Sequence, residues 1–276
     1  MKLQEIQQRL YCGMTAIMPS TYKAFNDALT AALKADIDWS DMDIMTPSKL
    51  SVENGITVIP VSGVLLKGVG FPEEVCQLLG ICDIDFITDS LRIAQTDPNI
   101  ETIILDFNTG GGEVTGIYEL GKLIEETGKT KNLIGYTSTY DFSAGYWLTS
   151  KCNEFYMAPT SWAGSVGVCC ERYDVSESNK AEGIKVTPFA SSPKKFWNDP
   201  NYPMSDDEKA WIEQNIVNTT KLFQSEVLSN RDINPELLNA DIFIGNDCIK
   251  NNFCDGLFNS LYDLKAALIT QSQSSK

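Results

Sequence analysis

No histidine occurs among the 276 residues of this chain. Its absence excludes the Ser-His-Asp and Cys-His catalytic arrangements, because in both of them an imidazole accepts the proton of the nucleophile. It also removes a common metal ligand, and none of the eight cysteines forms a Cys-x-x-Cys pair. We therefore expect a protein that binds no metal and needs no cofactor.

Positive charge and long apolar stretches are also scarce. The chain has 22 lysines and arginines against 37 aspartates and glutamates, a net charge of −15, and phosphate backbones repel such an acidic chain. No stretch approaches the roughly 18 apolar residues of a membrane-spanning helix, and the first residues, MKLQEIQQRLYCG, lack the apolar centre of a signal peptide. We expect no nucleic-acid partner, no membrane span, and a cytoplasmic protein with reduced thiols.

The first part of the chain, residues 1–50, is predicted to be a helical appendage and linker. Phe25, Leu29 and Leu33 recur at the spacing of one helix face. The stretch from 38 to 55 is polar and rich in turn residues, which is typical of a linker.

The second part, residues 51–270, alternates apolar runs typical of strands with helical patterns. This alternation predicts an α/β domain with a parallel sheet, whose ligands bind where loops leave the carboxyl ends of the strands. The last residues, 271–276, are predicted to be a flexible tail. The expected strands cover residues 56–66, 101–108, 132–139, 154–159 and 184–190. The expected helices cover residues 85–98, 113–129, the stretch that begins at Ser143, and 205–231.

The loop DFNTGGGEV, residues 106–114, places three glycines between an expected strand and an expected helix. Glycine allows unusual backbone angles and leaves N–H groups uncovered, so Gly111 or Gly112 is a candidate donor of an oxyanion hole. Neither G-x-x-x-x-G-K-[ST] nor G-x-G-x-x-G fits the loop, which argues against a nucleotide ligand. The remaining alternative is a tight strand-to-helix turn.

One strand later, the stretch DFSAGYWLTS, residues 141–150, places Ser143 before the small pair Ala144-Gly145 and an apolar helical pattern. Small neighbours let a substrate carbonyl approach the backbone, and the start of a helix favours developing negative charge. Two adjacent loops at strand ends can surround one carbonyl with a hydroxyl and N–H donors, Ala144 being the second donor. The alternative is a small residue that permits close helix packing.

A nucleophilic Ser143 needs a base, and without histidine the candidate is a lysine. The pKa of such a lysine must fall from about 10.4 toward roughly 7–8, which burial or a nearby positive charge can bring about. The stretch SSPKKFWNDPNYPM, residues 191–204, offers Lys194 and Lys195 among aromatic residues. Two adjacent lysines are otherwise typical of a solvated surface.

Together these motifs resemble the signal peptide peptidase A family of serine proteases, in particular its phage-type members. LDFNTGGGEVTG is similar to the family's DIDSPGGEVAG segment, YDFSAGYWLTS to its AASGGYWIAS segment, and APTSWAGSVGV (158–168) to its TGSIGV strand. The resemblance covers about residues 56–270. It implies a Clp/crotonase-type fold, with a repeated ββα/βα core and a parallel sheet, and a Ser-Lys dyad.

The resemblance assigns the nucleophile to Ser143 and the base to Lys195. The family's G-K-x-K loop corresponds to SSPKK, in which Ser192 and Pro193 replace the usual glycine and first lysine, and this departure keeps Lys194 as a reserve base. The implied protein is a homo-oligomeric endopeptidase that works through an acyl-enzyme. It is either a phage or prophage head-maturation protease, acting on scaffold, portal or capsid proteins in the host cytoplasm or immature virion, or a cytoplasmic bacterial peptidase.

Two other classes stay open. A crotonase-like acyl-CoA enzyme shares the fold and the glycine-lined oxyanion hole, and its candidate acids here are Glu113 and Asp141. A non-catalytic assembly protein would keep the fold as an oligomerisation scaffold, and the departures in NTGGG and SSPKK are compatible with it.

Overall fold

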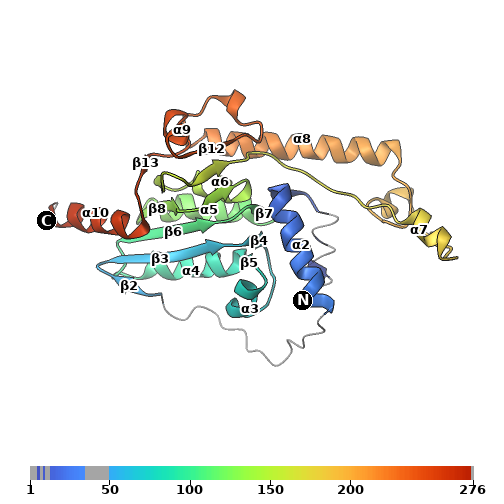
Figure 1. Ribbon diagram of the computed structural model, residues 1–276, viewed down its shortest axis with the longest axis horizontal. Coiled ribbons are helices and arrows are strands. Elements are labelled where there is room, and N and C mark those ends of the chain that lie inside the picture. The colour runs from blue at the N-terminus through green and yellow to red at the C-terminus, as the bar shows by residue number, and fades with distance from the viewer. Residues whose placement is uncertain (1–4, 7–8, 10–12, 35–49, 275–276) are drawn as a thin grey trace.

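The centre of the molecule is a six-stranded sheet with the strand order β13-β10-β8-β6-β3-β2 (Figure 1). The computed structural model describes residues 5–6, 9, 13–34 and 50–274. Neighbouring strands from β3 to β13 run parallel, whereas β2 joins the edge antiparallel to β3. The strands of this main sheet are β2 (Val52–Glu53), β3 (Ile56–Ser62), β6 (Thr102–Asn108), β8 (Asn132–Thr137), β10 (Glu154–Met157) and β13 (Gly256–Leu257).

Two smaller sheets lie beside the main sheet, with the orders β1-β7-β4-β5 and β12-β11-β9. The strands of the first are β1 (Thr15–Ile17), β4 (Val64–Leu66), β5 (Ile81–Asp83) and β7 (Gly111–Glu113). The strands of the second are β9 (Tyr140–Phe142), β11 (Trp162–Gly164) and β12 (Ile242–Ile244).

A strand of the main sheet is repeatedly followed by a short strand of a smaller sheet and then by a helix. The sequence β6, β7, α5 (Ile117–Thr127) is one such unit, and β8, β9, α6 (Ala144–Thr149) is the next. The strands β3 and β4 lead to α4 (Ile84–Thr96) in the same way, with α3 (Glu73–Leu78) and β5 inserted. This repeated ββα unit with a parallel sheet confirms the predicted fold class.

The main sheet is covered on both faces, which explains why its strands are apolar throughout. Successive residues of a strand point to opposite faces. In β6, Ile103 and Leu105 belong to the largest core cluster, whereas Ile104 packs with Leu264 of α10 (Leu261–Ser274). Because α10 continues to Ser274, helix extends into the predicted tail.

The N-terminal region departs from the expected appendage. The helix expected there is present as α2 (Pro19–Lys34), with Phe25 and Leu29 buried; the side chain of Leu33 and residues 35–49 lie outside the described residues. The strand β1, however, pairs antiparallel with β7 and is therefore part of a sheet of the core. A three-residue strand is too short to show an alternation of apolar and polar residues, and its partner strand lies almost a hundred residues later in the chain. The sequence therefore contains no signal for β1. The domain boundary at residue 50 stays a prediction.

Two of the expected strands differ from the structure. Residues 184–190 form no strand, and Phe189 is 89% exposed; β-branched residues alone do not make a strand without a neighbouring edge. The run 56–66 divides at Gly63 into β3 and β4, which lie in different sheets. Gly63 has a φ of +104°, and a Cβ there would lie 2.4 Å from Gly80 O, so only glycine fits the division.

The long helix α8 (Asp206–Leu228) confirms the helix expected from 205 to 231. Ser205 Oγ accepts the N–H of Glu208 at 3.2 Å, which is one half of a capping box. Figure 1 shows α8 extending away from the core, with α7 (Ser176–Ala181) near its far end.

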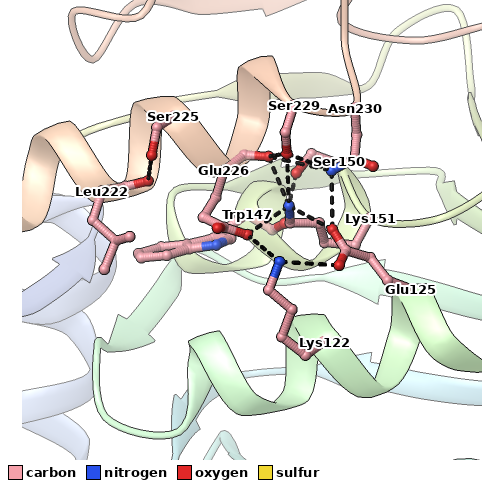
Figure 2. A network of polar contacts seen from close by, with 10 residues as sticks. All are labelled: Lys122, Glu125, Trp147, Ser150, Lys151, Leu222, Ser225, Glu226, Ser229 and Asn230. Atoms are coloured by element: carbon pink, nitrogen blue, oxygen red, sulfur yellow. Dashed lines mark hydrogen bonds and ion pairs between the residues drawn. The ribbon is translucent and has the colours of Figure 1, made fainter.

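The C-terminal half of α8 is fastened to α6 and α5. The rings of Trp147 and Phe223 stack with their centroids 4.5 Å apart. Beside them, the fully buried amine of Lys151 lies 2.8 Å from Glu125 Oε1 and 2.7 Å from Glu226 Oε2 (Figure 2). This network joins α5, the turn that follows α6, and α8, across up to 101 residues of sequence.

The network in Figure 2 keeps its carboxylates ionised. Burial would raise the pKa of Glu125, but hydrogen bonds from Lys151, Lys122 and Asn230 lower it to about 2. The amine of Lys122 lies 3.0 Å from Glu125 Oε2 and 3.0 Å from Glu226 Oε2, so it is a second cation paired with both carboxylates. The position of α8 therefore depends on buried, charge-assisted hydrogen bonds.

We predict that Lys151→Met lowers the free energy of unfolding by about 3 kcal/mol, because it leaves two partly buried carboxylates with one cation. Urea denaturation measures this value. The matched control is Lys209→Met on the exposed part of α8, where Lys209 and Glu213 are 65% exposed and 3.9 Å apart; we expect the wild-type midpoint there. Equal midpoints for both variants would show that the network does not fasten α8.

Candidate active site

Ser143 occupies the turn between β9 and α6, as expected for a hydroxyl at the start of a helix. Its backbone angles, φ 57° and ψ −117°, are rare for a residue with a side chain. Its N–H donates to Gly164 O at 2.8 Å and its Oγ donates to Gly167 O at 3.3 Å. A strained, buried serine held in this way is typical of functional turns.

The glycine loop lies directly against this turn. A Cβ on Gly111 would be 3.0 Å from Ser143 Cβ. The N–H of Thr109 donates to Tyr140 O at 3.2 Å, and the N–H of Phe142 donates to Thr109 O at 3.0 Å. The structure therefore brings together the two loops that the sequence predicts to share one site.

The three predicted oxyanion donors have different surroundings. The N–H of Gly111 donates to Thr109 Oγ1 at 3.1 Å, so it is already engaged. Gly112 lies within β7, between β1 and β4. Ala144 is the first residue of α6 and is fully buried next to Ser143. Because Gly112 pairs with Ala16 of β1, both glycines lie in hydrogen-bonded backbone, and Gly111 and Gly112 remain alternative donors beside Ala144.

Asp141 lies two residues before Ser143 and is fully buried. Neither of its carboxylate oxygens has a hydrogen-bond partner. Burial raises its pKa to about 7, and the Thr149 hydroxyl lowers it only in part. The Thr149 oxygen makes no hydrogen bond within the usual limits, so desolvation decides the direction of the shift.

Glu113, the other acid considered for an acyl-CoA reaction, is occupied by an ion pair. Both of its oxygens accept hydrogen bonds from Arg9, at 2.8 Å for Nε to Oε1. Arg9 also donates to Lys67 O at 2.8 Å. With Asp141 buried and Glu113 paired, neither candidate acid of this alternative is open to a ligand.

Lys194 and Lys195 are exposed in the turn Pro193–Phe196. The turn packs against the N-terminal half of α8, where the ring centroids of Trp197 and Trp211 lie 5.5 Å apart. Phe223, which stacks on Trp147 of α6, follows Trp211 by twelve residues and is therefore about 18 Å away along the helix axis. Within one chain the structure does not bring the two lysines to Ser143.

The residues that hold the lysine turn escaped the sequence analysis. Arg172 lies 3.3 Å from Glu208 and donates to Asp199 O and Tyr202 O at 3.0 and 2.7 Å. Glu208 also accepts the N–H of Asn198 at 2.8 Å. No sequence signal joins Arg172 to Glu208, because the pair is 36 residues apart and only the fold brings it together.

Other features of the molecule lie apart from this site. A cavity of about 290 Å³ has a lining that includes Phe71, Cys76, Asp85 and Phe86 but no residue of either site loop. Within the described residues no three His, Cys, Asp or Glu side chains are grouped so that they could hold a metal ion. The described cysteines are free thiols, most of them buried. Among the described helices, none combines the length and apolarity needed to cross a membrane.

Comparison with known proteins points to peptidases. The family described as Peptidase family S49 matches residues 125–268, a segment that contains Ser143 and Lys195 and begins after the glycine loop. Capsid assembly protease C of Escherichia phage lambda is 26% identical over 258 residues, covering 90% of this chain and 57% of that protein. Head-tail preconnector protein GP5 of Enterobacteria phage P21 is 23% identical over 212 residues, covering 76% of this chain and 42% of that protein. The chain thus spans about half the length of these relatives.

Solved structures show weaker similarity. A membrane-bound stomatin-specific protease in complex with a substrate peptide has a TM-score of 0.43 and 16% identity, covering 75% of this chain and 77% of that one. An enoyl-CoA hydratase/isomerase family protein from Silicibacter pomeroyi has a TM-score of 0.46 and 11% identity, covering 80% and 79%. These two values do not distinguish a peptidase from an acyl-CoA enzyme.

We predict that Asp141 makes stability fall as pH rises. Its folded-state pKa, about 7, lies above the ordinary value of 3.8, so the folded chain retains a proton that the unfolded chain releases. The resulting stability is fully present below about pH 4 and is lost by about pH 7, a loss of about 4 kcal/mol.

Denaturation midpoints of wild type and Asp141→Asn between pH 4 and 8 measure this effect. We expect the variant to lose most of the slope and to exceed wild type in stability at pH 8. A smaller slope remains, because burial also raises the pKa of Asp106 to about 6. The exposed Glu119→Gln serves as the control and should keep the wild-type slope. An unchanged slope in Asp141→Asn would contradict the assignment.

Proposed function

This chain belongs to peptidase family S49, which matches just over half of its residues, and from that premise we propose a serine endopeptidase with Ser143 as nucleophile and Lys195 as base. The match agrees with the resemblance to the signal peptide peptidase A family. The observation that carries the proposal is the strained, buried Ser143 against the glycine loop. It supports the proposal because acyl transfer requires a hydroxyl and backbone N–H donors around one position.

In the proposed reaction, Ser143 Oγ attacks a peptide carbonyl and its proton passes to the lysine amine. The N–H group of Ala144 and that of either Gly111 or Gly112 stabilise the oxyanion. The lysine then gives the proton to the leaving amine, which separates and leaves an acyl-enzyme. Water attacks the ester with the lysine again as base, and the second product and free Ser143 result.

We further propose that the lysine reaches Ser143 from a second copy of the chain. Lys195 is exposed in the turn that lies beside the N-terminal half of α8, away from Ser143 of its own chain. Exposed apolar side chains accompany it there, with Ile184 50%, Phe189 89% and Trp211 48% exposed, and such surfaces are typical of protein interfaces. Assembly into a homo-oligomer would bury this surface and surround the lysine with apolar groups.

Lys195 is favoured over Lys194 as the base. The amine of Lys194 lies 5.1 Å from the ring centroid of Trp197 and is stabilised there by a cation–π contact. A lysine held over an aromatic face is less free to enter a neighbouring site.

The similarity to the capsid assembly protease of phage lambda supports a role in phage head maturation. The substrates would then be scaffold, portal or capsid polypeptides, in the host cytoplasm or the immature virion. A cytoplasmic peptidase resembling signal peptide peptidase is the second role that the family supports. No nucleic-acid partner, cofactor or metal is part of the proposal.

We predict that purified wild type cuts an unfolded protein such as casein, and that Ser143→Ala and Lys195→Ala each lower the rate by at least about a thousandfold. Mass spectrometry of the fragments measures the cleavage and gives its specificity. Lys194→Ala is the matched control and should retain activity. Cleavage that survives Lys195→Ala but not Lys194→Ala would move the base, and an assembled but inert wild type would favour the non-catalytic scaffold.

A second prediction concerns the origin of the lysine. If Lys195 acts on a neighbouring chain, co-assembly of Ser143→Ala with Lys195→Ala restores activity at up to about a quarter of the sites, since each intact site combines two intact halves. The variants are mixed under dissociating conditions, reassembled and assayed on casein. If both residues act within one chain, every site lacks one of them and no activity returns.

A further inference from the structure

The nucleophile is covered by a segment of its own chain. Ser143 is only 1% exposed. Ala16 O and Ser143 Cβ lie 2.0 and 3.0 Å from the same point, the position of a Cβ on Gly111, so these two atoms are no more than about 5 Å apart. No polypeptide substrate can reach the hydroxyl while this segment stays in place.

We propose that residues 14–18, with the sequence MTAIM, are an internal pseudosubstrate that occupies the peptide-binding groove. The groove binds an extended polypeptide with a small residue next to Ser143, the position that Ala16 fills. A substrate enters only when this segment leaves. This inference rests on the proposed peptidase function for its activity test, but the binding site itself does not.

The segment is paired as a bound peptide strand would be, on both of its edges. On one edge, β1 pairs antiparallel with β7, and Met18 N donates to Gly110 O at 2.8 Å. On the other edge, Thr15 and Cys169 exchange two hydrogen bonds, N to O, of 2.9 and 2.8 Å. Addition of an extended strand to open sheet edges is a common way to recognise a peptide without regard to most of its side chains.

The two edges are the walls of the active site itself. Gly110 belongs to the glycine loop. Cys169 lies just beyond Gly167, whose carbonyl accepts the hydrogen bond of Ser143. A strand held between these walls crosses in front of the nucleophile, which explains why Ala16 O comes so near to Ser143.

The side chains of the segment point alternately to two cores. Ala16 is fully buried in the largest core cluster, together with Ala144 beside the nucleophile. Ile17 is buried in a second cluster with residues of α2, among them Tyr22 and Phe25. Because the Ala16 position is closed and packed, a larger side chain there would have to displace core atoms, and a substrate should carry a small residue at this point.

The segment is anchored on both sides, which helps to hold it in the proposed groove. Before it, Arg9 is paired with Glu113 of β7. After it, α2 buries Phe25 and Leu29. Tethering at both ends gives residues 14–18 a high effective concentration at the groove, and a free peptide must compete with it.

Two substitutions at Thr15 test the proposal through peptide binding, in the inactive Ser143→Ala background. Thr15→Pro removes the N–H that bonds Cys169 O, whereas Thr15→Val keeps it. The probe is a fluorescein-labelled peptide, GMTAIMP, and binding is measured by anisotropy. We expect Thr15→Pro to bind it at least tenfold more tightly than Thr15→Val. A second peptide with leucine in place of the alanine should bind at least tenfold more weakly than GMTAIMP.

A reversible lock provides the second measurement and covers the case in which Thr15→Pro does not fold. Thr15 Oγ1 lies 3.5 Å from Cys169 Sγ, so Thr15→Cys can form a disulfide that holds the segment in the groove. Oxidised protein, with the disulfide confirmed by mass spectrometry, should lose cleavage of casein and binding of the peptide, and reduction should restore both. The double variant Thr15→Cys/Cys169→Ala is the control and should not respond to oxidation.

The outcomes separate the two proposals. Cleavage of casein that is equal in the oxidised and reduced states would overturn the pseudosubstrate while leaving the peptidase intact. Peptide binding that depends on the lock, in a protein that never cleaves, would support the groove and overturn the peptidase. Equal peptide affinity for Thr15→Pro and Thr15→Val, both folded, would also overturn the pseudosubstrate.

Discussion

The close approach of the glycine loop to the nucleophile turn is the constraint on which the site depends. At Gly111 a Cβ would lie 2.0 Å from Ala16 O and 3.0 Å from Ser143 Cβ, so any side chain there would separate three segments that now touch. Gly145 plays the same part on the other side, where a Cβ would lie 2.4 Å from both Thr109 Cγ2 and Asp141 Oδ1. The absence of side chains at these positions allows the two loops to pack closely, as the proposed oxyanion hole requires.

The strain at Ser143 is maintained by the surrounding core. Its positive φ is unfavourable for a residue with a side chain. It persists because Tyr146 and Trp147 are fully buried just after it and because Gly164 and Gly167 hold the turn by hydrogen bonds. The repeated ββα unit supplies this frame, since each short strand carries the chain from the main sheet to the point where the loops meet.

The two proposed halves of the catalytic dyad are placed very differently. Ser143 lies within the core of ββα units, whereas Lys195 lies on a turn that Arg172 and Glu208 attach to the N-terminal half of α8. The network around Lys151 fastens the C-terminal half of that helix. A helix with one anchored end and one exposed apolar end is suited to present its turn to a neighbouring molecule.

The sequence alone determined those features that depend on neighbouring residues. The missing histidine excluded a Ser-His-Asp triad, and the glycine loop and the Ser143 turn were recognisable because each motif is local. Local sequence patterns also predicted the helix α2, and they predicted the bounds of α4 and α8 to within three residues. Only the tertiary structure decided the pairing of β1 with β7, the absence of a strand at 184–190 and the ion pairs of Glu113 and Lys151. The physical reason is that helices form from contacts three or four residues apart, whereas a short strand or a buried charge is stable only when a distant segment supplies its partner.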